Sequence, residues 1–409
     1  MNNQHTDASL RWNTRISRRE RKELKKTRGS LCALRSLWFN FLVCCSSSYL
    51  LPIVQGVDVA KESSPDRNLT LDLGQNVTMQ MKWIPAGKFL EGAEADKPKD
   101  NTPPREVTIS KPFFMATTEV TRRQFDAFVV QTGYQTDSEK RGWATFWDRP
   151  TKSNKPISGR DWRHPGFEQD ADHPVSCVTW NDANRFCEWL SKKSGRPLRL
   201  PTEAEWEYAC RAGTTTHFQW GNDAQSNGLC NVADETLEQA LKNMPPLAGI
   251  PADFTVAALT DGYPFTSPVA RFKANAWGLH DMHGNLWEWC ADWAKNEPFK
   301  GNKIDPRGPA SGTKRVIRGG CWADKPNSAR SISRVGWEPE NADIGVGFRV
   351  CCEELAQASA ASPQPAAPAG TQGASTPADR IKQIKQLMEQ GLIDKEEYDR
   401  RVKEILDAI

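Results

Sequence analysis

Tryptophan is the residue type that most constrains how this chain can fold. The 409 residues include 16 Trp but only 5 Tyr, and 14 of the Trp lie between Trp83 and Trp337. Indole rings bury large apolar areas, and the 28 Gly and 27 Pro of the chain favour turns. We therefore expect a compact domain of little regular secondary structure, packed by large side chains.

Basic residues are concentrated near the N-terminus. Residues 1–36 hold ten Lys and Arg against three acidic residues, which gives this segment a net charge of +7. The whole chain has a net charge of +3, so the rest of the chain has a net charge of −4. A dedicated nucleic-acid-binding protein carries its basic surface on the folded part. The charge distribution therefore predicts no nucleic-acid partner.

An apolar run, Leu37–Val54, follows this basic segment, and Val54-Gln55-Gly56 has the residue sizes of a cleavage site. A basic stretch followed by an apolar one is typical of a signal peptide. We predict that residues 1–56 direct export, with a cleaved signal peptide as the first interpretation. An uncleaved N-terminal membrane anchor is the alternative.

Cysteine usage points in the same direction. Eight of the 11 Cys lie from Cys177 to Cys352, with no Cys-x-x-Cys pair and no zinc-like spacing. This pattern favours some disulfides in an exported protein, and the spacing leaves their connectivity open.

Three segments of the main domain have helical signals. Thr121 is a candidate cap for a helix that runs toward Gln131, and Asn181 for a second helix that ends near Gly195. Thr202 begins a capping-box sequence, Thr-Glu-Ala-Glu, for a third helix. Strands are expected at Glu106–Ser110 and Arg315–Arg318.

The C-terminal region divides into a linker and a helical tail. Residues 354–377 have no sustained apolar period and are rich in Ala, Pro and Ser, as in a flexible linker. In residues 378–409, apolar side chains recur at helical spacing on either side of Gly391, and Asp394 can cap the second helix. Such a two-helix hairpin buries too little surface alone, so we expect a protein partner or self-association.

Eight short motifs follow one another along the main domain. They are Trp83–Gly87 with Glu91-Gly92, Thr118–Thr121, Trp180–Ala183, Arg199–Tyr208, Asn275–Leu279, Gly284–Trp289, Arg318–Gly320 and Gly347–Arg349. In these motifs the chain resembles the formylglycine-generating enzyme family, also called sulfatase-modifying factors. The resemblance implies an irregular α+β domain with a C-type-lectin-like fold over residues 79–352. The tail, through Gly391–Glu397, similarly resembles the short C-terminal (SHOCT) module.

The resemblance also implies two structural calcium sites. Ca²⁺ takes several oxygen ligands from carboxylates and carbonyls. One site would use the side chains of Asp281 and Glu288 with the carbonyls of Gly284 and Leu286. The other would use the side chains of Asn231 and Asp261 with the carbonyls of Val232 and Tyr263. The alternative is that these acids only cap turns or lie on the surface.

Copper is not expected. The oxidases of this family hold Cu(I) with two thiolates between the Arg-Gly-Gly and Gly-Phe-Arg motifs, and soft thiolates are the expected ligands of Cu(I). By direct count these positions are Asp324 and Ala329, and no Cys occurs between Cys321 and Cys351. A carboxylate and a methyl group cannot replace two thiolates.

Three further cysteine positions are interpreted through the resemblance. Cys321, where the family usually has Ser, is a weak catalytic candidate, and a buried or disulfide-bonded Cys is the alternative. Cys187 is expected to pair with Cys351 or Cys352. The partner position of Cys210 is Ser331, so that second bridge is expected to be lost.

The sequence thus predicts an exported, calcium-stabilised domain that lacks the paired copper cysteines and binds a peptide or small-molecule ligand. The first alternative is a formylglycine-generating oxidase that acts on sulfatase cysteines through Cys321 or an unrecognised ligand set. The second is an assembly factor that acts through the C-terminal hairpin and an N-terminal anchor.

Overall fold

The computed structural model describes eight stretches of the chain. They are residues 67–92, 104–148, 153–224, 228–243, 256–295, 301–354, 377–389 and 394–407. The predicted export segment, residues 1–56, lies outside the described residues, as does the predicted linker except for its two end residues.

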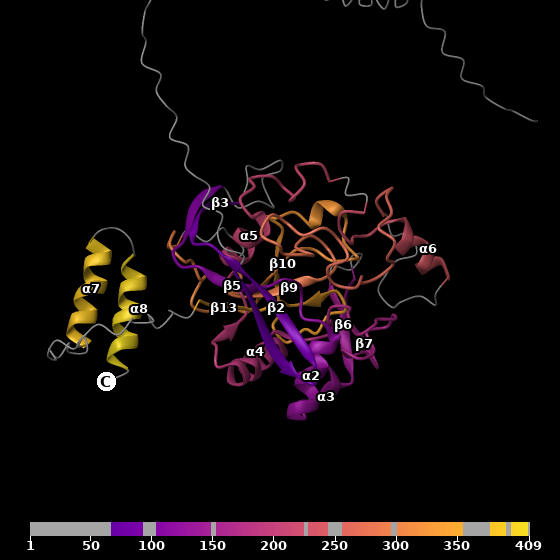
Figure 1. The fold of residues 1–409 in the computed structure, drawn as a ribbon, viewed down its shortest axis with the longest axis horizontal. Helices are drawn as coiled ribbons and strands as arrows, with labels where there is room; N and C mark the ends of the chain where they lie inside the picture. Colours follow the sequence, from indigo (N-terminus) through magenta and orange to yellow (C-terminus); the bar gives the residue numbers. More distant parts are fainter. Residues whose placement is uncertain are drawn as a thin grey trace, which may run out of the picture. The chain divides into compact units, whose positions relative to one another are not determined.

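A five-stranded antiparallel sheet forms one half of the domain (Figure 1). Its strand order is β1 (Asn68–Gly74), β2 (Val77–Ile84), β5 (Phe113–Ala116), β13 (Cys351–Glu353) and β8 (Leu198–Arg199). The edge strand β1 alternates buried and exposed residues, so the sheet begins before the expected domain start at residue 79. Neighbouring strands such as β5 and β13 come from opposite ends of the domain, so the sheet is complete only when both ends have folded.

A second sheet has the order β11 (Arg334–Trp337), β10 (Arg315–Arg318), β9 (Trp287–Trp293) and β12 (Val346–Gly347). Two hairpins complete the strands: β3 (Gly87–Glu91) with β4 (Arg105–Ile109), and β6 (Trp143–Asp148) with β7 (Ser153–Ser158). The two strands expected from the sequence are therefore present as β4 and β10. Long segments between the elements, such as residues 256–286, contain no helix or strand.

The helices of the domain begin at capping residues. Thr121 caps α2 (Arg122–Thr132) and Thr202 caps α5 (Glu203–Arg211), both with a complete capping box as predicted. The predicted cap at Asn181 is wrong, because Thr179 caps α4 (Trp180–Ser194) and the Asp182 carboxylate accepts from the Thr179 N–H at 2.8 Å. Two shorter helices are α3 (Asp137–Arg141) and α6 (Glu235–Asn243).

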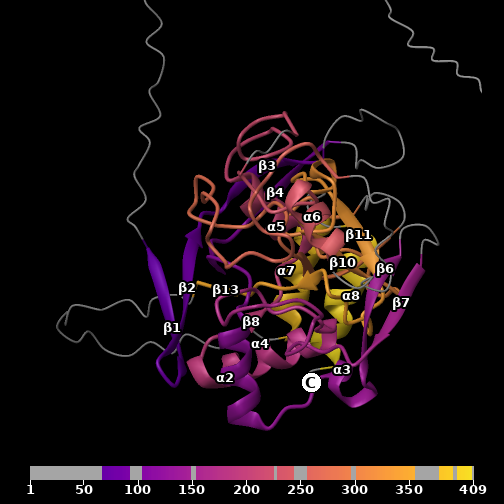
Figure 2. The same ribbon diagram turned by 90° about the vertical axis from the view of Figure 1, so that its right-hand side faces the viewer.

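The five-stranded sheet separates two parts of the core (Figures 1 and 2). On one face, Phe114 and Ala116 of β5 belong to the same apolar cluster as side chains of α2 and α4, among them Phe125 and Phe186. On the other face, Phe113 and Met115 share a cluster with Trp206 and other side chains of α5. Successive residues of a strand point to opposite faces, so the four-residue β5 anchors both halves.

The predicted Cys187 disulfide is not formed. None of the eight cysteines in the described part of the chain is disulfide-bonded, and all eight are buried. Cys351 and Cys352 point to opposite faces of β13, and Cys352 lies in the cluster that contains Cys187. The Cys351 sulfur instead accepts a hydrogen bond from Arg199 at 3.1 Å, and the thiols pack as small apolar side chains.

The C-terminal tail consists of two helices, α7 (Pro377–Glu389) and α8 (Lys395–Leu406), that lie side by side (Figure 1). Asp394 caps α8, as the sequence predicts, by accepting from the Glu397 N–H at 2.8 Å. The apolar side chains of Ile384 and Val402 remain partly exposed in this pair. Among the described helices, none is long and apolar enough to cross a bilayer.

The cap of α4 is directly testable. The Thr179 hydroxyl accepts from the Asp182 N–H at 3.0 Å and donates to Asp137 at 2.9 Å. We expect Thr179→Ala to lower the free energy of unfolding by about 1–2 kcal/mol, whereas Asn181→Ala leaves it nearly unchanged. Urea unfolding of both variants measures this, with Thr179→Ser as the control that keeps the hydroxyl. Equal losses for the two alanine variants would contradict the assignment.

Candidate functional site

A buried ion pair joins three of the sequence motifs. Glu288 and Arg349 are both fully buried, and two nitrogens of Arg349 donate to the two Glu288 oxygens at 2.6 Å each. Trp206 of α5 donates its indole N–H to the same carboxylate at 2.7 Å. Both oxygens of Glu288, a predicted calcium ligand, therefore already accept hydrogen bonds.

Two further buried carboxylates lie close to this pair. Glu119, between β5 and α2, is 1% exposed, and neither of its oxygens has a hydrogen-bond partner. Asp281 accepts from the Ala270 N–H at 2.7 Å through one oxygen, while its other oxygen is buried without a partner. Three carboxylates thus face one guanidinium, which leaves an excess of buried negative charge.

The pKa values reflect this excess. Burial raises the pKa of Glu119 well above its usual range, and the charges of Asp281 and Glu288 raise it further. Burial also raises the pKa of Asp281 to about 6, although Arg349 and a backbone N–H act in the opposite direction. Unpaired buried charge is costly, so a cation at this point would offset a cost that the protein alone leaves uncompensated.

The second predicted ligand group joins two residues just before α6, Asn231 and Val232, to two that follow it in the chain, Asp261 and Tyr263. The N–H groups of Val232 and Tyr263 donate to the two oxygens of Asp261 at 2.9 Å each. Asn231 is fully buried; its side-chain N–H donates to Phe265, whereas its side-chain oxygen has no partner. Burial raises the pKa of Asp261 to about 7. The structure thus brings together the four residues that the sequence predicts.

Backbone contact joins the two predicted groups. The Asn285 N–H donates to the Asn231 carbonyl at 2.8 Å, and Gly284 lies opposite Asn231 in an isolated bridge. A Cβ on Gly284 would lie 2.0 Å from that carbonyl oxygen, and its φ is +83°. Only glycine fits there. Leu286, the fourth member of the first group, is fully buried just before β9.

The donor chemistry of both groups fits a hard cation such as Ca²⁺. Within the described stretches, no cluster of three or more His, Cys, Asp or Glu side chains is arranged to hold a metal ion. A calcium ion would therefore need amide and carbonyl oxygens as well as carboxylates. Glu119 is not among the ligands predicted from the sequence, although it lies in the Thr118–Thr121 motif as an acidic residue directly before a buried Val.

The third site centres on Asp324, the position that corresponds by count to the first copper cysteine. Its Oδ2 accepts hydrogen bonds from the Trp287 indole at 2.6 Å, from the Cys321 N–H at 3.2 Å and from the Cys321 thiol at 3.3 Å. Cys321 is 6% exposed, and a Cβ on Gly345 would lie 3.1 Å from its sulfur. The thiol is therefore enclosed between a carboxylate and the backbone.

The second copper position, Ala329, is fully buried in an apolar cluster with Cys230 and Val232. Its carbonyl accepts a hydrogen bond from His283 at 2.7 Å, and burial lowers the pKa of His283 to about 4. The Ala329 side chain itself therefore supplies no sulfur ligand. Ser331, the predicted partner position of Cys210, lies near it and donates its hydroxyl to the His217 carbonyl at 3.0 Å.

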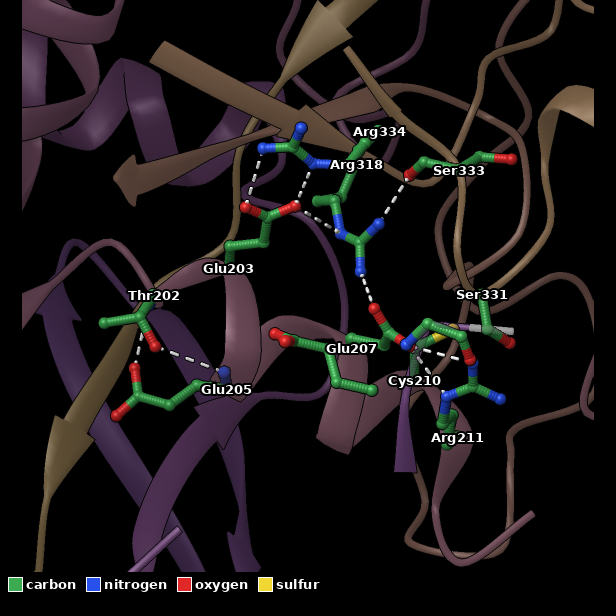
Figure 3. A network of polar contacts seen from close by, with 12 residues as sticks. Thr202, Glu203, Glu205, Glu207, Cys210, Arg211, Arg318, Ser331, Ser333 and Arg334 are labelled. Atoms are coloured by element: carbon green, nitrogen blue, oxygen red, sulfur yellow. Dashed lines mark hydrogen bonds and ion pairs between the residues drawn. The ribbon is translucent and has the colours of Figure 1, made fainter. Parts of the chain in front are cut away.

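A second buried ion network lies along α5 (Figure 3). Glu207 is paired with Arg318 and with Arg211, and it also accepts the Gly92 N–H at 2.8 Å. One turn earlier, Glu203 forms a fork with Arg334 at 2.6 and 3.0 Å. Residues of three sequence motifs thus meet in this network.

Comparison with known proteins gives the family. The model of the sulfatase-modifying factor enzyme 1-like domain matches residues 70–354. The chain belongs to the sulfatase-modifying factor family. The matched range covers both sheets, the two buried ion networks and the region of Cys321.

Relatives of this sulfatase-modifying factor domain include both active and inactive proteins by name. A formylglycine-generating enzyme of Thermomonospora curvata is 33% identical, over 69% of this chain and 96% of the relative. An inactive C-alpha-formylglycine-generating enzyme 2 of Mus musculus is 31% identical, over 68% and 87%. Among solved structures, PvdO from Pseudomonas aeruginosa matches with a TM-score of 0.55 and 28% identity, over 70% of this chain and 98% of that one.

The titration of Asp343 can be tested in this sulfatase-modifying factor domain. Asp343 is buried beside Gly345, and burial raises its pKa to about 7. Its folded-state pKa lies above the unfolded value near 3.9, so it contributes stability that is complete below about pH 4 and lost as the pH rises through 7. We expect Asp343→Asn to reduce this loss by on the order of 2 kcal/mol between pH 4 and pH 8.

Urea unfolding at a series of pH values measures the effect. Asp126→Asn, on the exposed face of α2, is the control and should follow the wild type. An unchanged pH dependence in Asp343→Asn would contradict the assignment of this titration to Asp343.

Proposed function

We propose that this chain is a binding or chemically divergent member of the sulfatase-modifying factor family, not a copper-dependent oxidase. The observation that carries the proposal is the environment of Asp324. A carboxylate oxygen with three hydrogen-bond donors stands where the first thiolate is expected, and the second position is a buried alanine. Hard oxygen and a methyl group do not hold Cu(I).

Relatives that are named as inactive are consistent with this proposal. Proteins named inactive C-alpha-formylglycine-generating enzyme 2 match this chain at 31% identity, so the family includes members that are named as inactive. The ligand would be a peptide or small molecule, as the sequence predicts. The second candidate is an oxidase that acts through Cys321, and the hydrogen bond from its thiol to Asp324 favours it.

A sulfatase-type peptide with the sequence Cys-x-Pro-x-Arg separates the two functions. Incubated with the full chain, Cu(I) and O₂, the peptide should keep its thiol, because the protein lacks paired soft ligands. Mass spectrometry and an aldehyde-reactive probe measure the outcome. The Thermomonospora curvata relative under the same conditions is the positive control. Aldehyde formation that Cys321→Ser abolishes would establish the oxidase instead.

We also propose that Ca²⁺ stabilises the domain. The support is the set of buried oxygens without partners on Glu119, Asp281 and Asn231, together with the backbone contact between the two groups at Gly284. Glu119 would join the ligands inferred from the resemblance. At each of the two sites the ion would supply positive charge beside buried oxygens that lack partners, and its role would be structural.

Chelation tests the calcium proposal. A ligand that binds only the native state stabilises it by about 2.7 kcal/mol at a hundredfold excess over Kd, so a chelator should lower the Tm. Glu119→Gln should raise the Tm of the calcium-free protein, because an amide avoids the cost of burying an ionisable carboxyl, and should reduce the gain in Tm on adding calcium. Asp324→Asn is the control and should respond to calcium as the wild type does. A chelator without effect on any variant, after prolonged dialysis, would reject the site.

The remaining predictions concern fold type, location and partners. We propose that the domain has a C-type-lectin-like fold, which is supported by the long segments without regular structure between two small sheets. We also propose that the protein is exported, which is supported by the basic and apolar sequence of residues 1–56.

The helical tail, which resembles the SHOCT module, would bind a protein partner or a second copy. The mass in solution of the chain with and without residues 378–409 measures self-association, and identical monomeric masses would exclude it.

A further inference from the structure

The strand β1 forms one edge of the five-stranded sheet (Figure 2). It has seven residues, whereas β8 at the opposite edge of the same sheet has two. Among the strands that the structure describes, β1 pairs with β2 alone. A free strand edge presents unpaired N–H and C=O groups, to which the strand of another chain can be added. β1 is therefore a candidate surface for strand pairing.

The hydrogen bonds of β2 show which backbone groups of β1 face outward. Thr70 lies opposite Gln80 in the register, and Asp72 lies opposite Thr78. The Gln80 carbonyl accepts from a backbone N–H just after β5, and the Thr78 carbonyl accepts from a side chain of α2, both at 2.9 Å. Directly opposite residues of an antiparallel pair exchange both hydrogen bonds or neither. The backbone groups of Thr70 and Asp72 therefore face away from β2.

The molecule covers one end of this edge and leaves the rest open. At the irregularity before the β1–β2 turn, the Leu73 carbonyl accepts from the Gln131 side chain at 2.7 Å, and Lys193 donates to that same side chain at 3.0 Å. No residue in the described stretches makes an equivalent bond to the outward backbone groups of Thr70 or Asp72. β1 also has none of the Pro or Lys residues that commonly protect edge strands.

The sequence of β1, Asn-Leu-Thr-Leu-Asp-Leu-Gly, is suited to pairing with itself. Leu71 is the central residue, and leucines alternate with other residues on both sides of it. Residues that lie opposite one another in an antiparallel pair share one face of the sheet. Pairing with an identical strand about Leu71 therefore places leucine opposite leucine on the core side. On the exposed side it places the Thr70 hydroxyl beside the Asp72 carboxylate of the other strand.

We propose that β1 pairs in antiparallel orientation with β1 of a second copy of this chain, about a two-fold axis at Leu71. The backbone groups of Thr70 in one copy bond to those of Asp72 in the other, and the reverse. The same strand edge serves on both copies, as in other two-fold dimers, and two five-stranded sheets join edge to edge. The interface depends neither on the ligand of the domain nor on the C-terminal hairpin.

Hydrogen exchange tests this pairing in the full chain. The exchange of the peptide that contains β1, measured by mass spectrometry at a series of protein concentrations, should slow in step with the fraction of dimer. Sedimentation equilibrium on the same samples gives that fraction. The physical reason is that the outward N–H groups of Thr70 and Asp72 become hydrogen-bonded only in the dimer.

Three outcomes of this measurement would overturn the proposal. Protection of the β1 peptide at every concentration would show that a segment of the same chain covers the edge. Association that leaves the exchange of this peptide unchanged would place the contact elsewhere, as at the C-terminal hairpin. A chain that stays monomeric at every concentration reached would exclude the pairing altogether.

Substitutions at the exposed residue Thr70 test the register. Thr70→Glu places a carboxylate opposite Asp72 of the second copy, so it should raise the concentration at half-dimerisation by about tenfold. Thr70→Lys places opposite charges there and should lower that concentration. Thr313→Glu, the same change at an exposed residue before β10, is the matched control and should associate as the wild type does.

Circular dichroism confirms that each variant is folded before its association is measured. Association of Thr70→Glu equal to that of the wild type would overturn the proposal. Weaker association in both Thr70 variants would do the same, because only one sign of charge is unfavourable opposite Asp72.

Discussion

The buried pair of Glu288 and Arg349 is the interaction on which the rest of the domain depends. Removing two charges from water is costly unless every hydrogen bond is made. Here Arg349 also donates to the carbonyls of His280 and Ala116, at 2.9 and 3.3 Å, and Glu288 accepts from Trp206. One pair thus ties β5, α5, β9 and the segment before β13 together. In a domain of short helices and strands, such ties replace the long interfaces that regular elements provide.

Local signals were predictable from the sequence, because each is made by neighbouring residues. The caps at Thr121 and Thr202 need only a hydroxyl and an acceptor three residues later, and both are present. The cap of α4 was placed wrongly because Thr179 and Asn181 are both good capping residues. Asp182 decides between them by reaching back to the Thr179 N–H, and the residue types alone do not show this.

The candidate sites were predictable only in part, because their electrostatics depend on residues far apart in the chain. The resemblance identified the acids of the calcium groups. It did not show that Arg349 donates hydrogen bonds to both oxygens of Glu288, or that Glu119 adds a third carboxylate. The expected Cys187 disulfide was wrong because burial suits a thiol as well as a bridge. A pocket at the start of α5 had no sequence signal, since Glu91 and Asp292, which both line it, lie about 200 residues apart in the chain.

The distribution of the motifs shows why family membership does not by itself establish activity in this protein. The motif residues Glu207, Glu288, Arg318 and Arg349 are buried in ion pairs, so the fold itself requires them whether or not any reaction occurs. Asp324 and Ala329, the positions that correspond by count to the copper cysteines, take part in no such ion pair. Asp324 is stable there because Trp287 and Cys321 donate hydrogen bonds to its carboxylate. A carboxylate at this position is therefore compatible with an intact scaffold, although it is not a soft ligand of the kind that Cu(I) prefers. A motif match of this kind reports the fold, and function has to be argued from the few residues that the fold does not need.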